Sequence, residues 1–384
     1  MPPVAAPREK NTRADGLRGV AALNVVLTHF VAAFLPALLH GNYPGIFPAA
    51  TTGSAWLQWL GSPPVTLFYN GHFPVLVFFV LSGYVLTLPI RDGSEDGRRV
   101  LQQRLWGRYL RLNLPIAGAI AVSYACYRLG WYSHVAAAQV SGSGWLAALL
   151  PQGIRAADAA TDALYGSILY GNGALIPPLW TLKIEFLGSL YLMLFYIARP
   201  ARSLALPVLL VFVMLYLLHG PDAIYFHAIF CGSFIGRIER RHLLPLFAIG
   251  LYFGAFQYES GLYRLLPDPV AFGQTLFDAK SLYNTIGAIL VTSAVINGWG
   301  GRFFDSRPIQ ALGRVSFSLY LIHFVVLCSL ASFVYLHLAP GRLALLTNLI
   351  LYLAASLVAA ALFHKCVDKP AIRLSHRFAA RLFA

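Results

Sequence analysis

Long apolar stretches, separated by short polar segments, recur along all 384 residues of the chain. A membrane-spanning helix needs about 20 mostly apolar residues. The stretches that approach this length are residues 17–36, 72–90, 112–130, 178–198, 203–219, 222–238, 243–257, 281–297, 311–335 and 343–364. Because a helix satisfies its own backbone hydrogen bonds inside a bilayer, the pattern predicts an all-α, polytopic transmembrane bundle of about ten spans.

The composition supports a membrane protein and excludes two other classes. Hydrophobic residues make up 58% of the chain and charged residues 11%, whereas a soluble domain is roughly one quarter charged. The net charge of +14 does not predict a nucleic-acid partner, because the basic residues alternate with apolar spans. The four cysteines are scattered without metal-ligand spacing, so we expect no metal site.

Basic residues predict how the chain crosses the bilayer. With a cytoplasmic N-terminus, the outside loops hold only Arg128, Arg155, Arg264, Lys280 and Arg342, and the other segments between spans hold many more. Such a bias favours the basic side as the cytoplasmic one. We therefore expect both termini in the cytoplasm and a multi-pass protein of a bacterial inner membrane.

The spans define the expected domain organisation. Residues 1–16 form a cytoplasmic tail, residues 17–365 the transmembrane domain and residues 366–384 a basic cytoplasmic tail. Two outside loops, residues 37–71 and 131–177, are long. Loops of that length in a compact protein are often functional.

The first span reads RADGLRGVAALNVVLTHF and carries two ionisable side chains, Arg18 and His29. Eleven residues make three helical turns plus about 20°, so both side chains lie on one face, roughly 16 Å apart. Ionisable groups at membrane depth are costly and usually functional. The spacing suits a long substrate that enters from inside and reacts near His29. Alternatively, Arg18 is an orientation anchor and His29 a helix-packing residue.

The fourth span, which begins PPLWTLKIEF, holds Glu185 about two turns from its outer end. His29 lies about as far from the outer end of its own span, so we expect the carboxylate to pair with His29 and orient its ring. The alternative partners are Lys183, Arg18 or a hydroxyl. Lys183 lies about 200° around the helix from Glu185, which disfavours it.

Two further motifs combine possible chemistry with possible packing. In LGRVSFSLYLIHF, Ser316, Tyr320 and His323 follow i, i+4 and i+7 spacing along one helix face, which suits either a catalytic seam or a hydrogen-bonded helix contact. In FFVLSGY, Ser82 and Gly83 favour close helix approach.

The predicted inside loop RRVLQQRLWGRYLRLNLP repeats arginine with helical spacing. Arg104, Arg108 and Arg111 would share one face and suit phosphate groups, because guanidinium binds them with paired hydrogen bonds. Binding of anionic lipid headgroups is the alternative.

Together these motifs resemble the membrane-bound acyltransferase 3 family, which includes O-acetylases of bacterial surface glycans, over roughly residues 13–365. The resemblance rests on Arg18 followed after ten residues by His29, FFVLSGY at 78–84, Arg108-Tyr-Leu-Arg111, WTLKIE at 180–185 and SFSLYLIH at 316–323. The sequence departs from the family pattern after Arg111, where LNLP lengthens the spacing to proline.

The resemblance implies transfer of an acyl group, most often acetyl, from cytoplasmic acyl-CoA to a hydroxyl of an extracytoplasmic glycan or glycolipid. Acyl-CoA is then a donor substrate, with no permanently bound cofactor. His29 would be the catalytic base, Glu185 its orienting group and Arg18 part of the donor path. The expected substrate contacts are Arg104, Arg108, Arg111, Trp180, Ser82, Tyr320 and His323, with aromatics of the long loops, such as Trp145, on the acceptor side.

A transporter of a metabolite or proton is the rival interpretation, because a His–Glu pair in a membrane also suits a proton relay. A purely structural or regulatory subunit would leave the shared depth of His29 and Glu185 without a role. The ordered motifs favour the acyltransferase.

Overall fold

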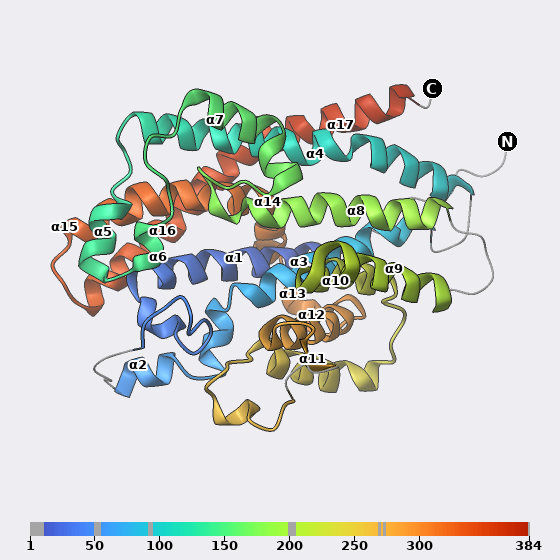
Figure 1. Ribbon diagram of the computed structural model, residues 1–384, viewed down its shortest axis with the longest axis horizontal. Helices are drawn as coiled ribbons and strands as arrows, with labels where there is room; N and C mark the ends of the chain where they lie inside the picture. The colour runs from blue at the N-terminus through green and yellow to red at the C-terminus, as the bar shows by residue number, and fades with distance from the viewer. Residues whose placement is uncertain are drawn as a thin grey trace.

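Apolar segments of the chain form helices, and α1, α4, α8 and α16 run along the longest axis of the molecule (Figure 1). The computed structural model describes residues 11–49, 55–90, 95–198, 205–267, 270–271 and 274–382. The longer helices are α1 (Thr12–Phe34), α3 (His72–Thr87), α4 (Glu95–Arg128), α8 (Trp180–Ala198), α9 (Ala205–His219), α10 (Ala223–Ser233), α11 (Arg240–Gly254), α12 (Ala279–Ile296), α14 (Arg307–Val326), α16 (Arg342–Phe363) and α17 (Lys369–Leu382).

Short elements occupy the connections. The short α-helices are α2 (Ala55–Leu60), α5 (His134–Ser141), α6 (Gly144–Ala147), α7 (Ala156–Thr161), α13 (Gly301–Phe304) and α15 (Ser332–His337). The 3₁₀ turns are η1 (Pro36–Leu39), η2 (Val65–Tyr69), η3 (Leu88–Ile90), η5 (Pro177–Leu179), η6 (Gly220–Asp222) and η7 (Gly261–Tyr263), and the π-helical segments are η4 (Asp162–Tyr170), η8 (Leu327–Ala331) and η9 (His364–Asp368). Strands β1 (Val270–Ala271) and β2 (Gln274–Thr275) pair antiparallel.

The all-α class is confirmed, and every predicted span coincides with a helix over most of its length. By length and composition, seven segments of the described chain can cross a membrane: Thr12–Phe34, His72–Ile90, Pro177–Ala198, Leu206–Ser233, Ala279–Ile296, Arg307–His337 and Arg342–Leu382. Leu206–Ser233 contains most of two predicted spans, 203–219 and 222–238, which are joined through η6. The count of ten and the direction of crossing remain predictions.

Helices extend into both predicted tails, and the cytoplasmic location of the tails stays a prediction. Helix α1 begins at Thr12, inside the predicted N-terminal tail, of which residues 1–10 lie outside the described part. The predicted basic tail is helical up to Leu382: α16 passes through η9 into α17, which packs on α4. It buries the small residues Ala371, Ser375 and Ala379 in that contact. Small side chains allow such close helix packing.

Helix α1 contacts α3, α12, α14 and α16 and so links two large apolar clusters. Glycines bring some of these helices into backbone contact. A Cβ on Gly19 would lie 2.6 Å from the nitrogen of Gly313 in α14, and one on Gly83 would lie 1.7 Å from the carbonyl oxygen of Ile229 in α10. Gly83 therefore has the packing role that the sequence predicted.

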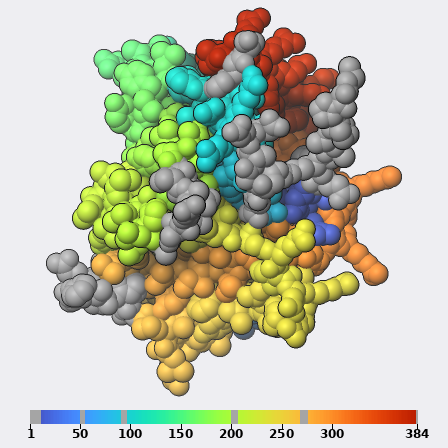
Figure 2. All heavy atoms as spheres, turned by 90° about the vertical axis from the view of Figure 1, so that its right-hand side faces the viewer, coloured from blue at the N-terminus to red at the C-terminus, as the bar shows by residue number. Residues whose placement is uncertain are grey.

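Figure 2 shows the end of the bundle where the start of α4 (cyan), α17 (red) and the beginning of α11 (yellow) are exposed. We call it the basic end. The exposed basic residues of these three helices in the described chain include Arg99, Arg240, Arg241, Arg373 and Arg377.

Candidate active site

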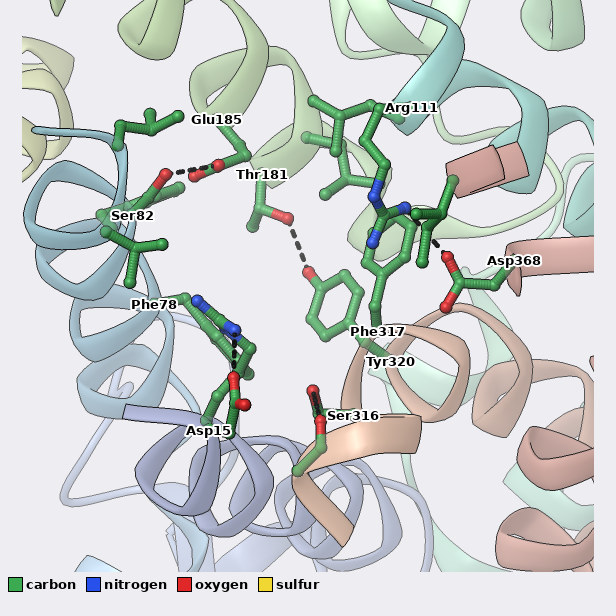
Figure 3. A pocket seen from close by; sticks show the side chains of 18 of the residues that line it. Asp15, Phe78, Ser82, Arg111, Thr181, Glu185, Ser316, Phe317, Tyr320 and Asp368 are labelled. Carbon is green, nitrogen blue, oxygen red and sulfur yellow. Dashed lines mark hydrogen bonds and ion pairs between the residues drawn. The ribbon is translucent and has the colours of Figure 1, made fainter. Parts of the chain in front are cut away.

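A cavity of about 430 Å³ lies among α1, α3, α4, α8, α14 and η9 (Figure 3). Its wall is apolar on α3, where Val75, Phe78 and Phe79 contribute, and polar on the helices opposite. The predicted site residues that line it are Arg18, Ser82, Arg108, Arg111, Glu185, Ser316 and Tyr320. The structure therefore brings five distant motifs of the sequence to one cavity.

Arginine–carboxylate pairs provide most of the charge in this cavity. Arg18 bonds Asp15 one turn earlier in α1 at 3.2 Å, and Arg111 of α4 bonds the buried Asp368 of η9 at 2.9 Å. Arg108 of α4 pairs with Glu185 of α8. Each carboxylate holds its guanidinium in place, and each guanidinium has further N–H groups with which to bind a ligand.

The expected pairing of Glu185 with His29 is wrong. Glu185 Oε1 accepts hydrogen bonds from Ser82 Oγ at 2.6 Å and from Arg108 Nη2. Arg108 Nε also donates to Ser189 Oγ at 2.8 Å. A buried carboxylate needs a fixed cation beside it, and Arg108 of α4 supplies that cation.

The three arginines expected to form a phosphate-binding row do not act alike. Arg104 Nη1 donates to the carbonyl oxygens of Val85 and Leu86 at 3.1 and 3.4 Å, and so satisfies acceptors near the end of α3. Arg104 is absent from the cavity lining, whereas Arg108 and Arg111 belong to it. The helical spacing placed them on one helix correctly, but neighbouring helices use each guanidinium differently.

Tyr320 lies in the cavity wall next to the histidine pair. Its hydroxyl donates to the carbonyl oxygen of Pro178 at 2.9 Å and lies 2.7 Å from Thr181 Oγ1. The Tyr320 ring centroid is 6.1 Å from that of His323. Trp180, expected to contact substrate, lies outside the lining, with its ring 5.5 Å from that of Tyr225.

His29 and His323 form a direct pair between α1 and α14. His29 Nδ1 lies 2.8 Å from His323 Nε2, and the two rings are nearly parallel at 6°. Trp145 of α6 stacks on His29 with ring centroids 5.5 Å apart. Neither histidine lines the cavity itself. His29 and Arg18 thus share a helix, and the contacts of Tyr320 connect the cavity to the histidine pair.

Main-chain bonding determines where the protons of this pair sit. His323 Nδ1 lies 2.9 Å from the carbonyl oxygen of Leu319, which can only accept, so Nδ1 carries a proton. In a neutral ring Nε2 is then an acceptor, and His29 Nδ1 must be the donor across the 2.8 Å contact. His29 Nε2 is therefore left with its lone pair, the form that a general base requires.

The packing of α1 against α14 explains why these histidines meet. Gly19 and Gly313 are in backbone contact, and His29 and His323 each follow ten residues later. The two helices run in the same direction, and ten residues rise about 15 Å in each, so the imidazoles reach the same depth. The equal spacing was a usable signal in the sequence, but it needs the knowledge that α1 and α14 are neighbours.

Several cavity residues were not anticipated: Asp15, Thr181, Arg314, His364 and Asp368. Arg314 is exposed, and no ion pair joins it to another residue of the described chain. Its signal in the sequence was its position one turn before Phe317 and near Ser316, on the face of α14 that lines the cavity.

The acyltransferase 3 family model, described as an acyltransferase domain, matches residues 11–267. Acyltransferase R4 of Phoma sp. is 22% identical, over 98% of this chain and 97% of its own length. O-acetyltransferase PaAT-1 of Phomopsis amygdali is 27% identical over 51% of this chain, and the match spans 43% of that relative. No solved structure matches the chain. The chain is a membrane protein, and it belongs to the acyltransferase 3 family.

Proposed function

We propose that this acyltransferase moves an acyl group, most often acetyl, from acyl-CoA to a hydroxyl of an acceptor on the opposite side of the membrane. The observation that carries the proposal is the arginine-lined cavity, whose Tyr320 contacts a histidine pair with one free ring nitrogen. The cavity suits the anionic donor, because guanidinium groups bind phosphates through charge-assisted hydrogen bonds. The relative PaAT-1 is named as an O-acetyltransferase, which supports a hydroxyl acceptor.

The proposed reaction uses His29 as a base and then as an acid. His29 Nε2 takes the proton of the acceptor hydroxyl while its oxygen attacks the thioester carbonyl carbon. The carbon–sulfur bond then breaks, and the proton passes from His29 to the departing CoA sulfur. His323 stabilises the imidazolium of His29, since its Nε2 accepts the hydrogen bond from Nδ1 in both charge states.

The acceptor that we propose is a glycan or glycolipid on the extracytoplasmic side. We propose a bacterial inner membrane as the location, with both termini and the CoA-binding cavity on the cytoplasmic side. Clustering of exposed arginines at the basic end supports this orientation.

Purified protein in lipid discs, supplied with acetyl-CoA carrying a labelled acetyl group, provides the test. We expect wild type to release CoA and label an acceptor, His29→Ala to bind acetyl-CoA but lose more than about 100-fold in rate, and the exposed-histidine control His337→Ala to match wild type. Full activity in His29→Ala would refute the catalytic assignment. Absence of acetyl-CoA binding by wild type would refute the donor.

A further inference from the structure

A second cavity of about 430 Å³ lies at the opposite end of the bundle from the basic end. The beginnings of α3, α10 and α12 border it, together with the turn that follows η1. Its principal polar residues are Asn42, His72, Asp222, Asp278 and Lys280, and its aromatic residues are Tyr43, Tyr225 and Tyr258. The arginine-lined cavity proposed to bind acyl-CoA, which we call the donor cavity, contains none of these residues, so the reaction proposed above gives them no role.

Lys280 is 2% exposed, and its ammonium group is held on two sides. Nζ donates to Asn42 Oδ1 and to the carbonyl oxygen of Phe256, at 2.9 Å each, and lies 5.1 Å from the centre of the Tyr43 ring. An ammonium group has three N–H donors, so one remains after these two bonds.

Asn42 is fully buried, and its Nδ2 has no hydrogen-bond partner in the described part of the chain. The bond from Lys280 to Oδ1 fixes the orientation of the amide. His72 Nε2 is likewise buried without a partner among the described residues. Buried polar atoms are nearly always satisfied, so two orphaned atoms in the wall of one cavity indicate a polar occupant.

The charge around the cavity excludes a strongly anionic occupant. One ammonium, Lys280, faces two carboxylates, Asp222 and Asp278. Both carboxylates are exposed. Asp278 accepts hydrogen bonds from Tyr258 and from the backbone and hydroxyl of Ser281. Burial raises the pKa of Tyr258, so its phenol keeps its proton at neutral pH.

Donors, an exposed acceptor and aromatic faces together match a neutral polyhydroxylated molecule. We infer that this second cavity binds a neutral sugar unit of the acceptor, at a distance from the hydroxyl that receives the acyl group. The sugar oxygens accept from Asn42 Nδ2 and Lys280, its hydroxyls donate to Asp222, and a tyrosine ring covers its apolar face. This inference rests on the proposed function, because it assigns the site to the acceptor.

Aromatic contacts connect this cavity to the histidine pair. Tyr43 packs on Phe47 with ring centroids 6.2 Å apart, and Phe47 packs on Trp145 at 6.4 Å. Trp145 in turn stacks on His29. This series of ring contacts links the wall of the second cavity to the base.

Protection from labelling tests binding without requiring acyl transfer. Ile46 lines the second cavity and is 61% exposed. Full-length Ile46→Cys protein in lipid discs is treated with a maleimide, with modification at position 46 measured by peptide mass spectrometry because Cys366 is also exposed. The probes are methyl glycosides of neutral hexoses, with the matching uronic acid glycosides for comparison.

We expect at least one neutral glycoside to slow labelling, and its uronic acid counterpart to need about tenfold more ligand. Asn42→Asp, added to Ile46→Cys, keeps an oxygen that accepts from Lys280 and replaces the Nδ2 donor with a carboxylate oxygen, which can only accept and adds a negative charge beside the ammonium group. It should raise the half-protecting concentration about three- to tenfold, the scale of one lost hydrogen bond. Asp158→Ala, in the first turn of α7 and outside this cavity, is the matched control.

The inference is overturned if no neutral glycoside slows labelling at position 46, or if uronic acid glycosides slow it equally well. It is also overturned if adding Asn42→Asp to Ile46→Cys leaves the half-protecting concentration unchanged. The activity assay separates this failure from that of the proposed function. If wild type transfers acetyl groups and no glycoside protects position 46 in the Ile46→Cys protein, only the sugar site is refuted. If a glycoside protects position 46 in the Ile46→Cys protein but wild type neither binds nor consumes acetyl-CoA, the proposed reaction is refuted and the sugar site stands.

Discussion

The carbonyl oxygen of Leu319 determines which nitrogen of His29 carries a proton. The bond at His323 Nδ1 leaves Nε2 as an acceptor, and His29 Nδ1 donates to it. A hydrogen bond to one ring nitrogen commonly selects the tautomer at the other. At the scale of single residues, His323 is therefore a positioning residue for His29.

Substitution of His323 tests this role. His323→Phe keeps a ring but removes the acceptor, so we expect kcat to fall roughly ten- to 100-fold with little change in the KM for acyl-CoA. His323→Gln places an amide oxygen near the former Nε2 and should recover much of the rate. Equal losses in both variants, measured as initial rates of CoA release, would show that His323 contributes only packing.

Arg314 gives a second prediction at this scale. It lines the donor cavity without an ion pair in the described chain, so its guanidinium is available for a donor phosphate. Arg314→Ala should raise the KM for acetyl-CoA about tenfold, since a charged hydrogen bond contributes roughly 1.5–3 kcal/mol.

The matched control is Arg302→Ala, an exposed arginine at the same end of the bundle and outside the cavity lining. Its KM should equal that of wild type. If both variants shift the KM equally, general attraction of an anion, and not a contact in the cavity, explains the effect.

Backbone contacts between helices control the geometry at the scale of elements. Gly83 and Gly232 let α3 and α10 touch: a Cβ on Gly83 would lie 1.7 Å from Ile229 O, and one on Gly232 would lie 2.0 Å from Val80 O. Ser82, the residue before Gly83, holds Glu185. The helix crossing and the carboxylate of the cavity are therefore linked through adjacent residues.

Gly83→Ala should consequently reduce both stability and activity. Overpacking costs about 1–3 kcal/mol, and we expect the melting temperature in detergent to fall by several degrees, with a lower kcat because Ser82 shifts. Gly236→Ala is the control, since open space surrounds that position. A melting temperature equal to that of wild type in Gly83→Ala would mean that α3 and α10 are not in backbone contact.

Much of the arrangement of single helices follows from sequence patterns. Apolar length located the helices, and the i, i+4 spacing of Ser316 and Tyr320 identified the face of α14 that lines the cavity. Helix partners were less accessible. Arg104 was expected beside Arg108 and Arg111, but the start of its helix lies near the end of α3 and takes that guanidinium out of the cavity.

Opposite ends of the whole molecule carry the two cavities. The donor cavity opens among residues near the basic end, such as Asp15 and Arg314, and the second cavity lies where α3, α10 and α12 begin. If the basic end faces the cytoplasm, each cavity is on the side where its proposed ligand occurs.

Cysteine accessibility tests this orientation. In a Cys366→Ser background, Arg155→Cys lies in an exposed loop at one end and Arg377→Cys on exposed α17 at the other. A membrane-impermeant maleimide should label position 155 in intact cells and position 377 only after permeabilisation, because basic segments remain cytoplasmic. The reverse labelling pattern would mean that the protein has the opposite orientation in the membrane. The donor cavity would then lie on the side that lacks acyl-CoA.

The sequence alone determined the helical class, the apolar segments and the ionisable residues placed among them, because these depend on local composition and on the period of a single helix. It also singled out Arg18, His29, Glu185, Tyr320 and His323 as candidate site residues. Only the tertiary structure decided their partners. Glu185 bonds Ser82 and Arg108, and His29 bonds His323. A hydrogen bond between helices depends on which helices are neighbours and how closely their backbones approach, and glycine contacts far apart in the sequence set that geometry.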